Sequence, residues 1–206
     1  MTGTAQADVP DTELAPCSDL AVIAKITKLN PDPIPEAGPN EIVMVWPWTA
    51  DIEVEHVIYG QETRRHLKIQ VNLHTYFIPG IRHFLIFLRR NPTGYVAVDR
   101  PDPFILRDDN GRFVRPVFEA LARNDLYPQT WLPSDYQNFL KPIRYSYAGA
   151  WFNSYKTEVF QKALSSDSDL LAQRNGRVFV KQGLYLDDMA PWLAQRDSQS
   201  CYRPKD

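Results

Sequence analysis

Residues 51–60 read DIEVEHVIYG, and our interpretation of the fold begins with this stretch. Ile52 and Val54 alternate with polar residues, which is the pattern of a half-buried β-strand. The next strong apolar pair begins at Val57 and takes the opposite parity. A β-bulge near residues 55–56 would return Val57 to the core, and bulges of this kind bend the strands of small barrels. The stretch therefore predicts a long, bent barrel strand that ends in a turn at the glycine.

Further apolar runs complete a mainly β pattern in the first 100 residues. Residues 20–29 alternate with a period of two and are rich in β-branched side chains. Residues 67–77 alternate without error, and residues 83–88 are apolar on both parities, as in a central strand. A return strand is expected over residues 95–98. Together these five strands predict a small Greek-key barrel of the oligonucleotide/oligosaccharide-binding (OB) type.

The rest of the chain changes character after residue 115. We expect an α+β, mainly β fold in which the five-stranded OB-like Greek-key barrel carries a C-terminal extension of helices and a hairpin. In the extension, residues 177–180 and 183–185 predict a small hairpin, and residues 187–194 predict a final helix capped by Asp187. The expected organisation has three parts: a polar tail (1–16), the barrel (17–115) and an α/β extension packed on the barrel (116–206).

The overall charge excludes a strong general attraction to polyanions. The chain has 23 Lys and Arg residues against 25 Asp and Glu residues, for a net charge of -2. Binding to nucleic acid or to an anionic membrane by counterion release requires a concentrated basic surface. No apolar run approaches the roughly 18 residues of a membrane-spanning helix, so no membrane span is expected.

Three short motifs resemble one protein superfamily, that of the tissue inhibitors of metalloproteinases and the netrin modules. The motifs are CSDLAVIAK at residues 17–25, the strand at 51–60 that ends in Tyr-Gly, and FLIFL at 84–88 with its return strand. The likeness covers about residues 17–115 and implies an OB-like barrel in an exported protein. It does not imply protease inhibition, because this sequence lacks the inhibitory N-terminal Cys-x-Cys.

Two features bear on the compartment. Cys17 and Cys201 are the two cysteines of the sequence, and a disulfide between them would contribute on the order of 5 kcal/mol in the chain-entropy model. The alternative is a pair of free thiols in a cytoplasmic protein. Residues 5–7, Ala-Gln-Ala, have the small-x-small form of a signal-peptidase site, or match it by chance. We expect a periplasmic or secreted protein, with a cytoplasmic one as the alternative.

Familiar catalytic motifs do not occur in the sequence. It contains no Gly-x-Ser-x-Gly elbow, no P-loop and no GxGxxG. His66 and His74 share one strand face but stand roughly 26 Å apart at the rise of a strand, so they cannot share a metal. His56 and His83 are expected to be structural. We therefore predict no catalytic residue, no metal site and no cofactor.

The polar face of residues 67–77 is the candidate binding surface, with two arginines beside it. The alternatives are a face that is merely solvated, or one covered by the residues after 116. The predicted binding residues are Arg64, Arg65, His66, Lys68, Gln70, Asn72, His74 and Tyr76.

The leading functional hypothesis is a non-enzymatic, exported binding module that recognises a protein partner in the manner of an inhibitor or an immunity protein. The first alternative is an oligonucleotide- or glycan-binding barrel, since barrels of this type bind such ligands on a polar strand face. The second is an enzyme whose site is formed only in three dimensions. The sequence leaves the oligomeric state open.

Overall fold

The computed structural model describes residues 17–38, 42–77, 81–117, 136–144, 171–174 and 177–199, without the side chains of residues 174, 177–178 and 196–199. These residues form mainly strands. The described elements are β1 (Leu20–Pro31), β2 (Trp46–Tyr59), β3 (His66–Leu73), β4 (His83–Asn91), β5 (Gly94–Ala97), β6 (Asp102–Arg107), β7 (Phe113–Pro116), the 3-10 helix η1 (Tyr136–Phe139), β8 (Lys141–Pro142), β9 (Leu171–Arg174), β10 (Arg177–Val180), β11 (Gln182–Tyr185) and α3 (Leu186–Gln199).

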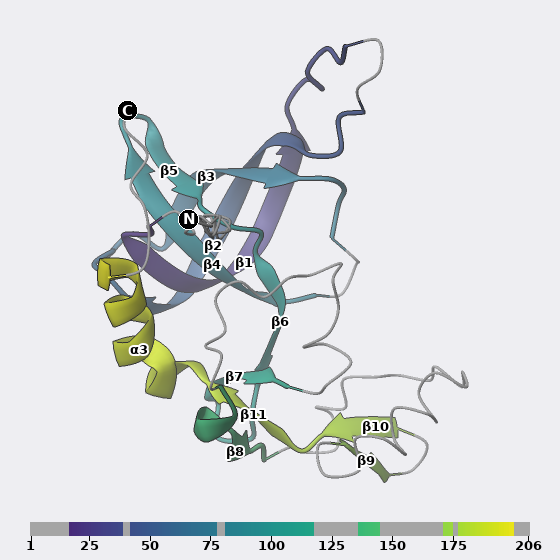
Figure 1. Ribbon diagram of the computed structural model, residues 1–206, viewed down its shortest axis with the longest axis vertical. Coiled ribbons are helices and arrows are strands. Elements are labelled where there is room, and N and C mark those ends of the chain that lie inside the picture. Colours follow the sequence, from purple (N-terminus) through teal and green to yellow (C-terminus); the bar gives the residue numbers. More distant parts are fainter. Residues whose placement is uncertain are drawn as a thin grey trace, which may run out of the picture.

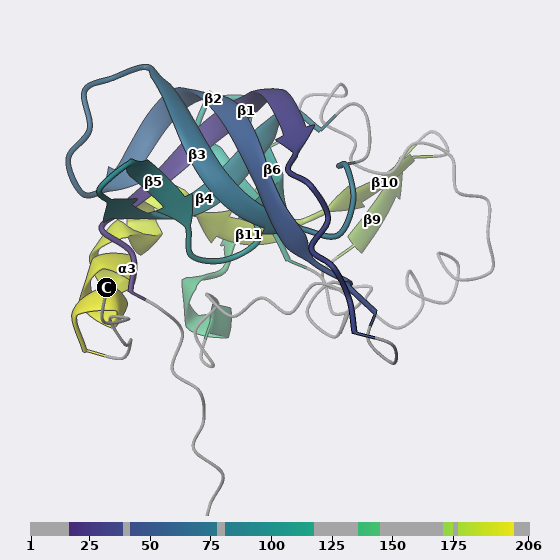
Figure 2. The ribbon, with the colours of Figure 1, turned by 90° about the horizontal axis from the view of Figure 1, so that it is seen from above.

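Five strands close into a barrel, shown in Figures 1 and 2. Their order is β1-β2-β3-β5-β4, and β4 pairs back to β1. Neighbouring strands are antiparallel except β3 and β5, which are parallel. This Greek-key arrangement is that of the OB fold, so the expected mainly β, OB-like barrel with a C-terminal helix is confirmed.

The predicted bulge in β2 is also confirmed. The pairing of β1 with β2 shifts so that Glu55 and Ile58 are extra residues on β2. The extra residue Glu55 lets Val57 pack against the barrel core, while Ile58 faces a second buried cluster. β2 thus bends around the barrel, as the slip in its apolar pattern predicts.

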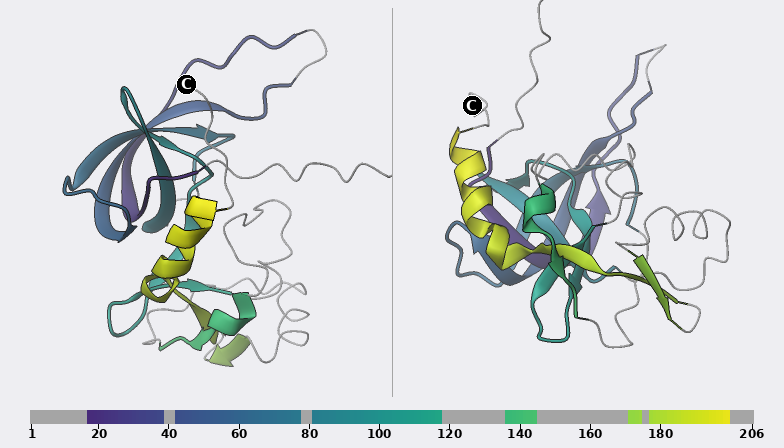
Figure 3. Two further views of the ribbon diagram at one scale, coloured as in Figure 1. Left: turned by 60° about the vertical axis from the view of Figure 1, so that its left-hand side comes forward. Right: turned by 60° about the horizontal axis from the view of Figure 1, so that its bottom comes forward.

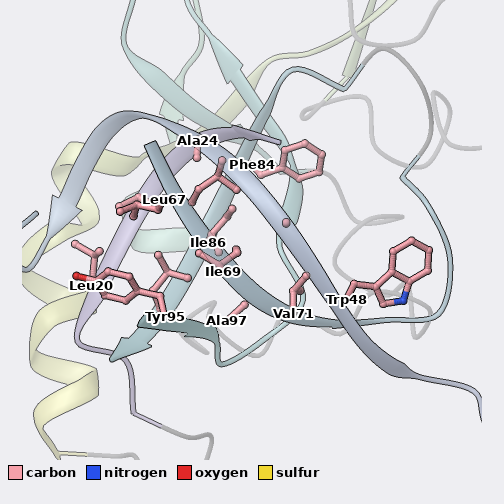
Figure 4. Close-up of a cluster of buried hydrophobic side chains, with 14 of the residues drawn as sticks. Leu20, Ala24, Trp48, Leu67, Ile69, Val71, Phe84, Ile86, Tyr95 and Ala97 are labelled. Atoms are coloured by element: carbon pink, nitrogen blue, oxygen red, sulfur yellow. The ribbon is translucent and has the colours of Figure 1, made fainter. Parts of the chain in front are cut away.

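β1 and β4 are buried on both faces because they separate two apolar cores. Alternate residues from Leu20 to Ala24 and from Phe84 to Leu88 enter the barrel interior, part of which Figure 4 shows. The residues between them, such as Ile23 and Leu85, enter the second cluster, which also contains residues of β7, β11 and α3. This explains why the run at 83–88 is apolar on both parities.

The C-terminal strands continue the sheet beyond the barrel. β6 pairs with β4 and forms a hairpin with β7, which pairs with β11, and β11 pairs with β8. α3 packs its apolar side on the second cluster through Leu186, Met189 and Leu193. Figure 3 shows α3 running from these strands to the barrel.

Two expectations for the extension are wrong. β10 and β11 do not form a hairpin with each other, because a single residue, Lys181, separates them and a hairpin turn needs two or more. β10 pairs instead with β9. The final helix begins at Leu186, so Asp187 lies inside its first turn and does not cap it.

Gly60 closes the turn after β2 and requires glycine for two reasons. Its φ is +86°, in the left-handed region. A Cβ at this position would also lie within 2.4 Å of the Asp19 carbonyl oxygen. The turn at the end of the 51–60 stretch is therefore built against the chain that enters β1.

Candidate binding surface

β3 presents its polar residues on the outside of the barrel. The apolar side chains from Leu67 to Leu73 point inward and are at most 5% exposed. The six predicted residues of the opposite face are all exposed: His66, Lys68, Gln70, Asn72, His74 and Tyr76. In Figure 2, β2 and β3 run across the side of the barrel turned to the viewer. No described residue covers this face.

At one end of this face, Arg64 and Tyr95 both bind the carboxylate of Glu62. Arg64 donates to Glu62 from Nε at 3.0 Å and from Nη2 at 2.8 Å, and the Tyr95 hydroxyl donates to Glu62 at 2.7 Å. The hydrogen bonds from Arg64 hold the pKa of Glu62 well below its ordinary value, against the effect of burial. The guanidinium groups of Arg64 and Arg90 lie 5.6 and 5.7 Å from the Tyr95 ring centroid. Arg64 is thus engaged within the molecule.

The other basic residues of the face also have acidic neighbours. Arg65 Nη2 lies 2.6 Å from Glu53 Oε1. Lys68 is the cross-strand partner of Asp51. The face is consequently mixed in charge, and it lacks the continuous positive groove that binds a nucleic-acid backbone.

The last two predicted residues belong to a different surface. β3 ends at Leu73, so His74 and Tyr76 lie in the connection to β4. His74 Nδ1 is 2.6 Å from the Met44 carbonyl oxygen, and the Tyr76 ring packs edge-on against Trp48 with centroids 4.7 Å apart. The expectation of one continuous strand to residue 77 is wrong. From residue 74 the chain turns toward the β1–β2 connection.

Exposed large apolar side chains gather in these two connections. The described part of the chain has five of them, four in the β1–β2 connection and one in the β3–β4 connection. They are Ile34 (61% exposed), Ile42 (83%), Met44 (55%), Val45 (54%) and Tyr76 (58%). We call these five residues the apolar end. A group of exposed apolar side chains of this kind marks an interaction site more often than a solvated surface.

The base and the first arm of the β1–β2 connection are conformationally restricted. β1 and β2 remain paired up to Pro31 and Trp48, and the Asp32 amide adds a bond of 3.1 Å to the Pro47 carbonyl. Residues 31–35 place a proline at every second position, and each proline fixes its φ. Figures 1 and 3 show the arms extending away from the barrel. The support of Ile34 on the first arm is therefore stiffened, which reduces the entropy lost on binding.

An aromatic cluster joins the apolar end to the barrel core. Trp46 stands 5.6 Å from Trp48 and 6.5 Å from His74, measured between ring centroids. Trp48 is 2% exposed, and its Nε1 donates to the Leu73 carbonyl at 3.1 Å. Figure 4 shows Trp48 at one end of the core and Tyr95 at the other. Trp48 thus fixes the base of both connections.

His56 and His83 lie where the barrel meets the extension. His56 Nε2 is 2.7 Å from Asp187 Oδ1 in the first turn of α3, and His83 Nδ1 is hydrogen-bonded to Glu55. Both rings pack against Phe113, with centroid distances of 5.9 and 5.4 Å. Two histidine–carboxylate pairs therefore lie at this junction. In each pair the two residues belong to different elements, so the pair links those elements.

Glu55 makes the stability of this junction depend on pH. Burial acts to raise the pKa of Glu55, but hydrogen bonds from Lys25 and His83 lower it below its usual 4.5. A carboxyl group with a pKa lowered by folding stabilises the folded state above its unfolded pKa, and this contribution is lost as the pH falls. We expect the free energy of unfolding to decline as the pH drops below about 4.5, and to decline less steeply in Glu55→Gln.

Urea denaturation at a series of pH values from neutral to acidic measures this dependence. Glu36→Gln is the matched control, because Glu36 is exposed and forms none of the ion pairs of the described residues. If the free energy of unfolding of Glu55→Gln falls with decreasing pH as steeply as that of the wild type, the pH dependence does not come from Glu55.

Cys17 lies three residues before the start of β1 and is buried and disulfide-bonded. Cys201, the sequence's other cysteine, lies outside the described residues. The disulfide therefore anchors the chain where it enters the first barrel strand.

Comparisons with known proteins add no further assignment. No family model matches the chain, and neither a curated protein nor a solved structure matches it significantly. Among the described residues, no three His, Cys, Asp or Glu side chains are grouped to hold a metal ion. In the same part of the chain, no helix combines the length and apolar character needed to cross a membrane.

The sequence-based interpretation missed the four apolar residues of the β1–β2 connection. β2 begins at Trp46 and runs through Pro47 without a break, so residues 42–45 lie outside it. The sequence of the opposite arm, residues 31–39, does indicate that residues 42–45 stay unpaired. Residues 31–39 include four prolines, which cannot donate to a strand ladder, so the apolar residues 42–45 had no partner strand to pair with.

Proposed function

We propose that this protein is a non-enzymatic, exported binding module that recognises a protein partner through the apolar end. The observation that carries the proposal is the gathering of all five exposed large apolar residues of the described chain on two neighbouring connections. A pre-organised apolar surface with aromatic residues at its base has the composition of a protein interface core.

The exported location is supported by two observations of different kinds. Cys17 is disulfide-bonded, and disulfides persist in oxidising compartments. The sequence resemblance to the netrin modules points the same way, and the OB-like barrel is compatible with it. An inhibitor-like or immunity-like role follows if the partner is an enzyme.

An oligonucleotide- or glycan-binding role has less support. Arg64 and Arg65 are each paired with a glutamate, and Lys68 faces an aspartate across the ladder. A backbone-binding groove would require these charges to be free for phosphate.

Site-specific photocrosslinking tests the proposal. A photoreactive phenylalanine analogue at position 42 is expected to crosslink to one protein of the native compartment. The same analogue at position 70, on the exposed β3 face, is the matched control and is expected to give little of this product.

The affinity of the purified partner for each variant then measures how much the apolar end contributes to binding. Ile42→Ser combined with Met44→Ser is expected to weaken binding by about 10- to 100-fold, since each buried apolar contact contributes about 1 kcal/mol or more. Gln70→Ser combined with Asn72→Ser should leave the affinity within about twofold. The proposal fails if the second pair of changes weakens binding and the first does not.

A further inference from the structure

The β1–β2 connection carries charges of one sign. Between Leu29 and Trp46 the sequence has three acidic residues, Asp32, Glu36 and Glu41, and neither lysine nor arginine. Asp32 is half-buried and Glu36 is exposed on the first arm, while Glu41 lies outside the described residues. The apolar end is therefore bordered by carboxylates.

These carboxylates differ from those of the adjoining strand. Glu53 and Glu55 on β2 are each paired with a basic side chain. In the part of the chain that the structure describes, Asp32 and Glu36 take part in none of the ion pairs. Asp32 accepts a long hydrogen bond of 3.4 Å from Thr49 Oγ1. Among the described residues, no basic side chain neutralises their negative charge.

The two carboxylates stand on either side of an exposed apolar residue. The segment reads Asp32-Pro-Ile34-Pro-Glu36, and Ile34 is 61% exposed. If Ile34 enters an apolar pocket, Asp32 and Glu36 come to the rim of that pocket. At a rim, complementary charges steer association and set specificity.

We infer that the partner presents an apolar surface bordered by lysine or arginine side chains. This inference rests on the proposed function and adds the charge of the partner to it. Lys28 on β1 and Arg64 after β2 are the lysine and arginine nearest along the chain on either side, and neither lies on the arms. An anionic lipid surface or a nucleic acid does not fit, because both would meet the uncompensated carboxylates of the arms.

Two synthetic amphipathic helical peptides with the same leucine face test the inference. One carries lysine along the borders of that face, and the other carries glutamate. Fluorescence anisotropy of the labelled peptides at low and high salt measures their binding to the full chain. The Leu/Lys peptide is expected to bind and to bind more weakly at high salt, whereas the Leu/Glu peptide is not.

Charge reversal locates the contact. Glu36→Lys is expected to weaken binding of the Leu/Lys peptide by about 3- to 10-fold. Asp109→Lys, an exposed charge reversal between β6 and β7, is the matched control and should leave binding unchanged.

The outcomes separate the two proposals. The inference about charge is overturned if both peptides bind equally, if the Leu/Lys peptide does not bind, or if phosphatidylglycerol vesicles bind the chain. It is also overturned if Asp109→Lys weakens binding as much as Glu36→Lys. If Ile42→Ser weakens Leu/Lys binding and Glu36→Lys does not, the apolar end remains a docking surface and the basic border is wrong. If Glu36→Lys weakens it and Ile42→Ser combined with Met44→Ser does not, the proposed function itself fails.

Discussion

Replacing Asp102 with alanine is expected to lower the free energy of unfolding by about 3–5 kcal/mol, because it removes the carboxylate that is hydrogen-bonded to a buried guanidinium. The side chain of Arg115 is 0% exposed and that of Asp102 is 7% exposed. Arg115 Nε donates to Asp102 Oδ2 at 2.8 Å, and the Phe104 amide donates to Asp102 Oδ1 at 2.9 Å. The pair links β6 to β7, where the sheet leaves the barrel, so its loss should weaken the attachment of the extension.

Urea denaturation followed by circular dichroism measures this loss. Asp102→Asn keeps an acceptor for the Phe104 amide, so it should lower the free energy of unfolding by less than the alanine variant does. Glu36→Ala, at an exposed position, should change the free energy of unfolding by less than about 0.5 kcal/mol. A change below about 1 kcal/mol in Asp102→Ala would contradict a desolvated pair at this site.

Replacing Trp48 with alanine is expected to cost about 3–5 kcal/mol and to loosen the apolar end. Trp48 contributes its indole ring to the barrel core and its Nε1 to the Leu73 carbonyl. It also contacts Trp46 and Tyr76. Its removal should therefore raise the amide exchange rates of the β1–β2 connection above those expected from the loss of global stability alone.

Hydrogen exchange with mass spectrometry of peptides that cover residues 42–49 measures the local effect. Trp48→Phe keeps an aromatic ring in the core but loses the indole hydrogen bond, and we expect it to cost about 1–2 kcal/mol. Leu85→Ala removes an apolar residue of the second cluster and serves as the control for a global loss of stability. Equal local exchange in Trp48→Ala and Leu85→Ala would show that Trp48 does not hold the arms.

The barrel was predictable from the sequence because its signals are local. The slip in parity at residues 55–57 corresponds to the bulge at Glu55, and the error-free alternation from His66 to Leu73 corresponds to a strand with one exposed face. The run at 83–88 indicates a strand covered on both sides, and β4 is such a strand. In each case the period of the side chains follows directly from the pleat of a strand.

The candidate surface was only partly predictable, because it depends on which strands find partners. His74 and Tyr76 were identified as surface residues, but the contacts that place them against Met44 and Trp48 join positions about 30 residues apart. Pairing of His56 with Asp187 spans 131 residues. No periodicity in a single segment encodes such contacts. Whether residues 42–45 pair or remain exposed is decided by the prolines of the opposite arm.

Oxidation of Met44 in the presence and absence of the partner tests whether the partner docks on the apolar end. Met44 is 55% exposed in the apolar end, whereas Met189 on α3 is 0% exposed and provides an internal reference. Mild peroxide treatment followed by peptide mass spectrometry gives the sulfoxide fraction at each position. If the partner docks on the apolar end, saturating partner should slow the oxidation of Met44 by at least about tenfold, with Met189 unreactive in both samples. Oxidation of Met44 at the same rate in the free protein and in the complex would contradict docking at this surface.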